Sequence, residues 1–271
     1  MDPTRVTPAG NQHAESSPPP VWRSPDGVSP GTWDYVHRRS IADDYDAFID
    51  QTPLCDLDQQ WIGQSFPPAA SAGVCVADFG AGTGRTTRFL IDRGYRVLAI
   101  DLSHSMLLQI ASSTDTDRVI ADPMRMRANL VQLDGLDDNT MDHGVCLFAT
   151  LGMIRGRDHR RTFLRHARRI IRPGGRFLLH VHHRWAALTE RGGVGRMIQS
   201  AVDRRFELGD AVYAYRGIGE MFMHRYGRRE LTADLRHAGW TNFDVQRINL
   251  RGDGLAKPWQ IAGGFFVQSG G

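Results

Sequence analysis

Apolar residues in the middle of this chain gather in short continuous runs. Val74–Ala77, Tyr95–Ile100 and Phe177–His183 are rich in β-branched, aromatic or other apolar side chains and are flanked by polar or glycine-containing segments. Runs of this length predict strands buried on both faces, as in a parallel sheet that is covered by helices.

The segments between these runs have the period of a helix. Arg85–Asp92 follows the first run as a helix candidate, and the apolar positions 163, 164, 167, 170 and 171 form one stripe of a second helix. Asp158 is a capping residue before that stripe, and Pro173-Gly174-Gly175 ends it. The alternation of strand and helix predicts an α/β fold around a doubly wound, mostly parallel sheet.

Three regions depart from this alternation. Residues 1–30 contain Pro18-Pro19-Pro20 and few apolar groups, which predicts a disordered tail, because the segment buries too little surface to offset the entropy of ordering. Residues 31–73 are predicted to hold two helices and a linker at 67–73. Residues 74–271 form the main domain, with an insertion at about 185–226. The remaining elements expected there are an amphipathic stretch Met197–Phe206, a strand Ala211–Tyr215, a helix Arg229–His237 and an antiparallel pair Asn242–Leu250 and Gly263–Gln268.

The clearest chemical signal lies where the first apolar run ends. Asp78 is followed by Gly80, Gly82 and Gly84 at alternate positions on the predicted strand-to-helix turn. Glycines remove Cβ atoms from this bend, so that backbone N–H groups can meet a ligand directly at a helix N-terminus. Asp101 ends the second run, where a carboxylate suits the two hydroxyls of a bound ribose. Position 85 is arginine, and not the third glycine of a dinucleotide fingerprint, so the spacing favours another nucleoside cofactor.

Five segments in this order resemble the class I S-adenosylmethionine-dependent methyltransferases of the small-molecule, UbiE-like type. Asp78–Gly84 is similar to their first motif, and Ala99–Leu107 is similar to the segment after it. Three weaker matches follow along the chain, and the five together cover roughly residues 74–183. The weaker matches are Ala128-Asn129-Leu130 with Leu133, Met141–Val145 and Arg169–Phe177.

The resemblance implies a Rossmann-like sheet of seven strands in the order 3-2-1-4-5-7-6, with residues 31–73 as an N-terminal helical lid. It implies S-adenosyl-L-methionine as the cofactor and methyl transfer to a small-molecule acceptor as the activity. It also implies which residues bind the cofactor: the glycine turn holds the methionine portion, Asp101 the ribose, and Leu102, Asn129 and Leu130 flank the adenine. The full set of implied cofactor contacts is Tyr45, Asp78, Phe79, Gly80, Ala81, Gly82, Gly84, Asp101, Leu102, Met106, Asn129, Leu130 and Phe148.

One of these residues departs from the family pattern. The adenine-flanking motif usually has Asp where this chain has Asn129. An Asn side-chain carbonyl can still accept a hydrogen bond from the adenine amino group, so the change is expected to be tolerated.

Candidate bases follow the fifth strand and precede the last helix. His182 and His183 stand at the carboxyl end of the strand, and His224 and Tyr226 lie in the Met221–Tyr226 segment that family members place over the substrate. A histidine at such a position can act as a general base near neutral pH, although each of the four can equally have a structural role. His180 is expected in the core, and no metal is predicted, because the histidines lack a fourth ligand in register.

Charge leaves a second acceptor class open. Residues 155–229 hold 18 Arg against 6 Asp plus Glu, a local balance of +12, although the whole chain carries only +3. Such an asymmetry suits RNA, and Met223-His224-Arg225-Tyr226 with Glu230-Leu231 bears a faint likeness to the wobble-uridine carboxymethyl family. The alternatives are therefore a tRNA nucleoside methyltransferase, or a cofactor-binding protein without activity. Solvated arginine faces explain the same counts.

The other compositional signals are brief. Three cysteines, Cys55, Cys75 and Cys146, are widely spaced and odd in number, which predicts reduced thiols and a cytoplasmic protein. The sequence has no apolar run that reads as a membrane span or signal peptide. Nothing in it predicts an oligomeric state.

Overall fold

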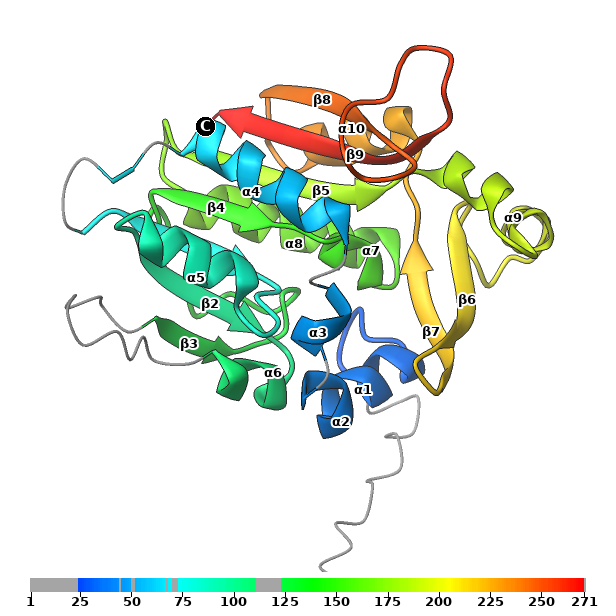
Figure 1. The fold of residues 1–271 in the computed structure, drawn as a ribbon, viewed down its shortest axis with the longest axis horizontal. Helices are drawn as coiled ribbons and strands as arrows, with labels where there is room; N and C mark the ends of the chain where they lie inside the picture. Colours follow the sequence, from blue (N-terminus) through cyan, green and yellow to red (C-terminus); the bar gives the residue numbers. More distant parts are fainter. Residues whose placement is uncertain are drawn as a thin grey trace, which may run out of the picture.

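Seven strands form one sheet through the middle of the molecule (Figure 1). In chain order they are β1 (Cys75–Phe79), β2 (Arg96–Asp101), β3 (Met124–Arg127), β4 (His143–Cys146), β5 (Arg176–His182), β8 (Asn242–Asn249) and β9 (Ala262–Gly270). They are arranged β3-β2-β1-β4-β5-β9-β8, and only β9 runs antiparallel to its neighbours. Because β8 and β9 are the sixth and seventh strands of this sheet, the predicted fold and order are confirmed.

The computed structural model describes residues 24–43, 45–49, 52–66, 68–69, 73–110 and 123–270. Most of the predicted tail, at residues 1–23, and much of the predicted linker at 67–73 therefore lie outside the described residues. The proposed boundaries of the tail, lid and main domain remain predictions.

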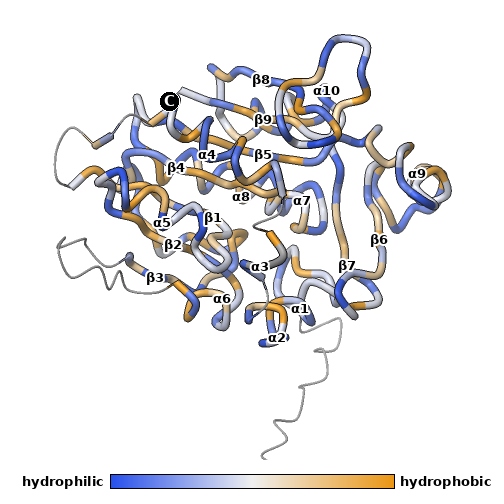
Figure 2. The backbone as a smooth tube through the Cα atoms, in the orientation of Figure 1, coloured by the Kyte–Doolittle hydropathy of each residue, from blue (hydrophilic) through white to orange (hydrophobic). Residues whose placement is uncertain are grey.

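Helices cover both faces of the sheet, as the alternation predicts. On one face α4 (Pro53–Ser65) and α5 (Arg85–Asp92) pack Trp61, Ile62 and Leu90 against Val76 and Leu178. On the other face α8 (Arg157–Ile170) and α10 (Arg228–His237) pack against the alternate strand positions, with a fully buried core. Successive side chains of β5 point to opposite faces of the sheet, so this one strand contributes to the cores on both sides. The hydrophobic character of β5 is visible in Figure 2.

The N-terminal region differs from the prediction. Four helices replace the two expected ones: α1 (Pro30–His37), α2 (Arg39–Asp43), α3 (Tyr45–Ile49) and α4. The chain is already packed before residue 30, since Gly27 and Ser29 are buried. Ser29 caps α1 by accepting a hydrogen bond from the Thr32 amide at 3.1 Å, and Pro30 begins the helix. Residues 27 and 29, which the prediction assigned to the tail, are therefore buried in the structure.

The insertion after β5 forms a separate unit beside the sheet. It consists of η2 (Arg184–Thr189), α9 (Gly193–Val202) and a two-stranded hairpin, β6 (Asp210–Tyr215) and β7 (Ile218–His224). In Figure 1 this hairpin stands next to α1, and β7 contacts both α1 and the short α7 (Thr150–Met153). The sequence predicted β6 but not β7, and it placed the amphipathic helix four residues too late.

Candidate functional site

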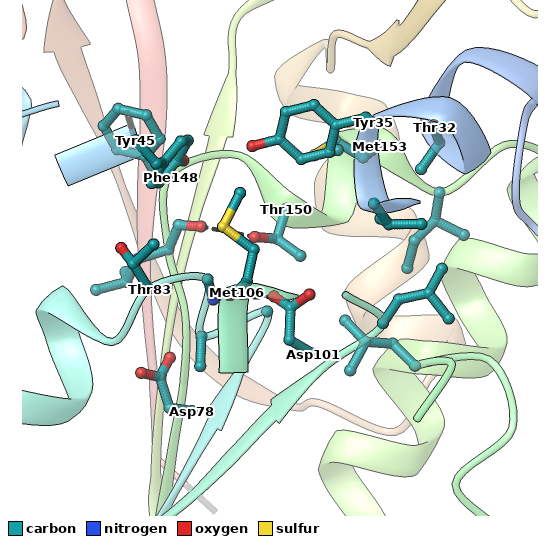
Figure 3. Close-up of a pocket in the computed structure, with 18 of the residues that line it drawn as sticks. Thr32, Tyr35, Tyr45, Asp78, Thr83, Asp101, Met106, Phe148, Thr150 and Met153 are labelled. Carbon is teal, nitrogen blue, oxygen red and sulfur yellow. Dashed lines mark hydrogen bonds between the residues drawn. The ribbon is translucent and has the colours of Figure 1, made fainter. Parts of the chain in front are cut away.

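A cavity of about 1050 Å³, including its open mouth, lies at the carboxyl ends of β1, β2 and β4. Its floor comes from the turn after β1, one wall from α6 (His104–Gln109), and its cover from α1 and α3. In Figure 3 the Asp101 carboxylate and the Tyr35 hydroxyl point into the same space, with Met106 between them. The lining residues are Gly27, Val28, Thr32, Tyr35, Val36, Tyr45, Ile49, Asp78, Gly80, Ala81, Gly82, Thr83, Arg85, Thr86, Asp101, Leu102, Met106, Asn129, Leu130, Leu147, Phe148, Thr150, Met153 and Ile154.

Two glycines of the turn are required by its backbone. Gly80 has φ +79°, and a Cβ there would lie 2.3 Å from Thr150 Cγ2. Gly82 has φ +56°, and the nearest atom to an added Cβ is Tyr45 Cε1 at 3.8 Å. Gly80 thus allows α7 to pack on the turn, whereas Gly82 keeps the turn bare on the cavity side.

The amides of this turn are mostly used within the protein. Gly80 and Ala81 donate to the Ile100 carbonyl at 2.7 and 3.0 Å, and Gly82 donates to Asp101 Oδ2 at 2.9 Å. Gly84 donates to the Ala81 carbonyl at 3.0 Å. The expectation that these N–H groups meet the ligand is therefore wrong for these four residues. The glycines provide close approach, and α5 begins at Arg85 directly after the turn.

Asp101 links the second strand to the glycine turn. Its Oδ1 accepts from the Ser103 amide at 2.8 Å while Oδ2 accepts from Gly82. Burial raises the pKa of this carboxyl above its usual value, and the amide hydrogen bonds from Ser103, Gly82 and Leu102 oppose that shift. The two amides fix the carboxylate at the cavity wall in one orientation, as binding a vicinal diol requires.

Asp78 lies deeper, with 2% of its surface exposed. It accepts a hydrogen bond from Thr87 Oγ1 at 2.7 Å, and burial raises its pKa to about 6. Asp78 therefore fixes the start of α5 against β1 from the cavity floor.

Two tyrosines cover the cavity. Tyr35 of α1 and Tyr45 of α3 are hydrogen-bonded to each other, and burial raises the pKa of Tyr45 to about 12 and that of Tyr35 well above its usual value. Both phenols are protonated at neutral pH and act as hydrogen-bonding groups. The neighbouring Asp46 holds α3 onto the turn, because it accepts from Thr83 Oγ1 and pairs with Arg88 at 3.1 Å.

Asn129 is held by the chain itself. Its Nδ2 donates to the Asp26 carbonyl at 2.9 Å, and its Oδ1 accepts from the Val131 amide at 3.1 Å. The expected bond from an adenine amino group to Oδ1 would have to use the second lone pair of that oxygen. Asn129 instead anchors the 26–28 segment over this end of the cavity.

Eleven of the thirteen predicted cofactor residues line the cavity, and Phe79 and Gly84 do not. Phe79 is fully buried among the rings of Phe163 and Phe177, because the side chains of β1 alternate between the two faces of the sheet. Gly84 is the left-handed residue that begins α5, and an added Cβ would lie 2.8 Å from Ile110.

None of the four candidate bases lines the cavity. His183 is 8% exposed and packs edge-on against Phe265, and burial lowers its pKa to about 4. His224 and Tyr226 are completely buried, and burial raises the pKa of Tyr226 far above its usual value. His182 is half-buried next to the insertion, and burial together with the Arg225 charge lowers its pKa to about 4. His180 lies in the core as expected, although its Nδ1 has no hydrogen-bond partner among the described residues.

His224 belongs to an ion-pair cluster under the hairpin. Its Nδ1 lies 2.7 Å from Asp210 Oδ1, and its Nε2 lies 3.2 Å from Glu230 Oε1. His224, Glu230 and Glu207 offer ligand atoms within 4.8 Å of one another. Each glutamate also pairs with a guanidinium: Arg160 lies 2.7 Å from Glu207, and Arg184 contacts Glu230. Two cations already balance these carboxylates, and no metal is assigned to the cluster.

Several residues that cover the cavity were not predicted to line it. Val28, Thr32 and Tyr35 come from the α1 region, and Ser29-Pro30 was a readable start signal for that helix. Thr150 and Met153 come from α7, which follows the left-handed residues Phe148 (φ 54°) and Ala149 (φ 63°). A positive φ at such residues is uncommon, so no sequence signal predicted this turn.

The arginine-rich segment is less basic in the fold than in the sequence. Nine of its 18 arginines form ion pairs, and several of the acids come from outside residues 155–229. Asp234, for example, pairs with Arg157 at 2.8 Å and with Arg161 at 2.7 Å. The local balance of +12 therefore does not describe a surface charge.

Two further predictions concern thiols and membranes. Cys75 and Cys146 form no disulfide with another described residue. Among the described residues, no helix combines the length and the apolar character needed to span a bilayer.

Comparison with known proteins supports the interpretation of the cavity. Residues 76–175 match the family model of a methyltransferase domain, and no curated protein matches the chain. The fold is similar to a methyltransferase of Methanosarcina mazei (TM-score 0.57, 17% identity, 72% of this chain and 91% of that one). It is also similar to the 1,6-didemethyltoxoflavin-N1-methyltransferase of Burkholderia thailandensis (0.55, 19%, 91% and 92%) and to a methyltransferase of Clostridium acetobutylicum (0.56, 13%, 85% and 97%).

These likenesses establish the fold, and the matched segment contains the glycine turn and Asp101 that shape the cavity. Residues 76–175 are therefore a methyltransferase domain by their family model, and the chain has the fold of the class I S-adenosylmethionine-dependent methyltransferases, whose cofactor is S-adenosylmethionine.

Proposed function

We propose that this chain transfers the methyl group of S-adenosylmethionine to a small-molecule acceptor that binds under α1 and α3. The observation that carries the proposal is the cavity itself. In it, the glycine turn and Asp101 lie opposite a cover of apolar and phenolic side chains. A space of this kind suits a small organic ligand.

The cofactor contacts follow from the lining residues. The bare turn at Gly80–Gly82 and the N-terminus of α5 would take the methionine portion, whose carboxylate benefits from the helix dipole and from Arg85. Arg85 is fixed from behind by Asp58, whose Oδ2 lies 3.0 Å away. Asp101 would hold the ribose, and Leu102 and Leu130 would enclose the adenine.

The residues of the cavity position the acceptor and do not deprotonate it. Bound S-adenosylmethionine supplies an electrophilic methyl group on a sulfonium, and the acceptor must present a nucleophile in line with that bond. Asp101 and Asp78 are engaged with Gly82 and Thr87, and both tyrosines are protonated at neutral pH. We therefore expect an acceptor with a free lone pair or an acidic proton of its own.

A small-molecule acceptor is favoured over RNA. The structurally similar Burkholderia thailandensis enzyme was crystallised with 1,6-didemethyltoxoflavin and S-adenosylhomocysteine. The present cavity lies beneath two helices, and half of the arginines that motivated the RNA alternative are neutralised by acids. A cofactor-binding protein without activity is also disfavoured, because Gly80, Gly82 and Asp101 retain accessible surface at the cavity.

The test has two measurements. Calorimetry should detect S-adenosylhomocysteine binding to the full chain, and labelled S-adenosylmethionine should transfer its methyl group to members of a panel of small amines, phenols and thiols. No binding at millimolar cofactor would overturn the proposal. Binding of tRNA that weakens steeply with salt, together with transfer to tRNA alone, would replace the acceptor class.

A further inference from the structure

The inner face of the β6–β7 hairpin continues the cover of the cavity. In the antiparallel register Tyr213 lies opposite Met221, and Ala211 lies opposite Met223, so that these four side chains share one face. Met221 belongs to the apolar cluster that also contains Tyr35, Tyr45 and Met153, which line the cavity. This face of the hairpin therefore packs against the residues that cover the cavity, although none of its own residues lines the cavity.

Arg225 is the next residue on that face. It follows Met221 and Met223 in the alternation of β7, and its amide donates to the Gly209 carbonyl at 2.9 Å, which extends the hairpin ladder by one residue. Tyr213 lies close enough for the Arg225 charge to lower the pKa of its phenol, although burial raises that pKa overall. Arg225 also lies near His182 at the end of β5.

The guanidinium of Arg225 is only partly satisfied. The residue is 8% exposed, and its Nη2 donates to Glu190 Oε2 at 2.9 Å. Its Nε and Nη1 are buried and have no acceptor among the described residues. Burying a cationic N–H group without an acceptor is unfavourable in free energy. A ligand that places an acceptor oxygen next to Arg225 would remove this penalty.

The charge around Arg225 does not balance. Glu190 Oε2 also accepts from Arg196 Nη2 at 2.9 Å, so one carboxylate serves two guanidiniums. His182 adds no charge at neutral pH, because burial and the Arg225 charge hold its pKa at about 4. Nearby, Asp210 Oδ1 lies 2.7 Å from His224 Nδ1, and Arg184 contacts Glu230. At Glu190, two guanidiniums share a single carboxylate, which leaves one positive charge in surplus there.

The geometry points to an acceptor that carries a carboxylate, held by Arg225 with the Tyr213 hydroxyl and the His182 ring beside it, so that its nucleophile faces the cofactor end of the cavity. This inference rests on the proposed methyl transfer. A carboxylate carries one negative charge, which equals the surplus, and its planar pair of oxygens matches the donor geometry of a guanidinium. Arg225 and Tyr213 would be positioning residues.

Benzoate and its uncharged analogue benzamide test the inference. Each is titrated by calorimetry into the full chain saturated with S-adenosylhomocysteine. Benzoate is expected to bind at least about tenfold more tightly than benzamide, because only benzoate neutralises the surplus charge. Equal affinity for the two probes would overturn the inference, and so would tighter binding of phenyl phosphate than of benzoate.

Variants locate the effect. Arg225→Met should remove the preference for benzoate, whereas Arg204→Met, which changes an exposed arginine of the same insertion, should retain it. Glu190→Gln should tighten benzoate binding, since it removes a competing carboxylate without deleting a buried group, and it stays informative if Arg225→Met does not fold. An unchanged preference in Arg225→Met, or weaker benzoate binding in Glu190→Gln, would contradict the assignment.

The cofactor titration separates this inference from the proposed function. S-adenosylhomocysteine affinity should be the same in the parent chain, Arg225→Met and Glu190→Gln. Loss of cofactor binding in the parent chain would remove the proposed function, whereas intact cofactor binding without a benzoate preference would remove only the carboxylate assignment.

Discussion

At the cofactor end of the cavity, Gly80, Gly82 and Asp101 come from two successive strand ends of one sheet. At the proposed acceptor end, Tyr213 and Met221 come from a separate two-stranded sheet that packs against α1 and α7, and Arg225 directly follows the second strand of that sheet. The first end presents carboxylates and backbone, which suit a ligand with hydroxyls and a positive charge. The second presents surplus positive charge. The chemistry common to the family is thus encoded locally, whereas the features that select the acceptor depend on distant segments meeting.

The largest effect is expected at Asp101. Asp101→Ala removes a carboxylate that is already oriented by two amides, and S-adenosylhomocysteine affinity should fall about 100-fold, or about 3 kcal/mol. Calorimetry gives the affinity, and circular dichroism confirms the fold. Asp92→Ala, at an exposed acid on α5, is the matched control and should bind normally. Equal affinities in the two variants would mean that Asp101 does not hold the cofactor.

At the other end, His224 should matter for stability and not for the cofactor. His224→Leu leaves buried Asp210 and the Glu230 carboxylate without this partner, which should lower the free energy of unfolding by about 2 kcal/mol. Urea denaturation measures the change, with the exposed His237→Leu as the control. Cofactor affinity should be retained in the folded variant. A large loss of cofactor affinity would show that the two ends are not independent.

Asp78 gives the cofactor end a distinctive pH dependence. Because its folded-state pKa is raised to about 6, the folded chain holds a proton that the unfolded chain releases near pH 4. The unfolding free energy should therefore fall by about 2 kcal/mol as the pH rises from about 4.5 to 7. Asp78→Asn should lack this component, and Asp56→Asn, at an exposed position, should keep it. Parallel pH profiles for parent and Asp78→Asn would contradict the assignment.

The smallest expected effect separates backbone strain from ligand contact. Gly82 (φ +56°) and Gly174 (φ +81°) both have left-handed backbones and no atom within 3.4 Å of an added Cβ. Alanine at either should therefore lower stability by about 1 kcal/mol. Only Gly82→Ala should also weaken S-adenosylhomocysteine binding, by about tenfold, because its methyl enters the cavity. If the two variants bind the cofactor equally well, the ligand does not approach Gly82.

Sequence patterns predicted the α/β alternation and the glycine turn, and the family resemblance supplied the strand order and most of the cofactor contacts. Buried strands appear as continuous apolar runs, and the glycine turn with Asp101 lies within about twenty-five residues, so that local rules suffice. They failed where contacts are remote. The four amides of the glycine turn are bonded within the protein, and the 26–28 segment bonds the Asn129 amide, whose expected contact with adenine remains a prediction.

The candidate bases illustrate the same limit. His183 follows the carboxyl end of a strand, and His224 lies in a segment that family members place over the substrate, yet both side chains are buried away from the cavity. Their direction depends on strand alternation and on partners such as Phe265 and Asp210, which come from other parts of the chain. A residue type and a position along the chain do not give the direction of a side chain.

The sequence by itself determined the α/β alternation and the location of the cofactor turn, because each depends on residues that are near one another in the chain, whereas the strand order followed from the family resemblance. Only the tertiary structure decided which arginines are neutralised and which side chains cover the cavity. The unpaired donors of Arg225 are one example. The charge balance and burial of this side chain depend on all the groups around it in space, and these come from β5, η2, α9 and the hairpin.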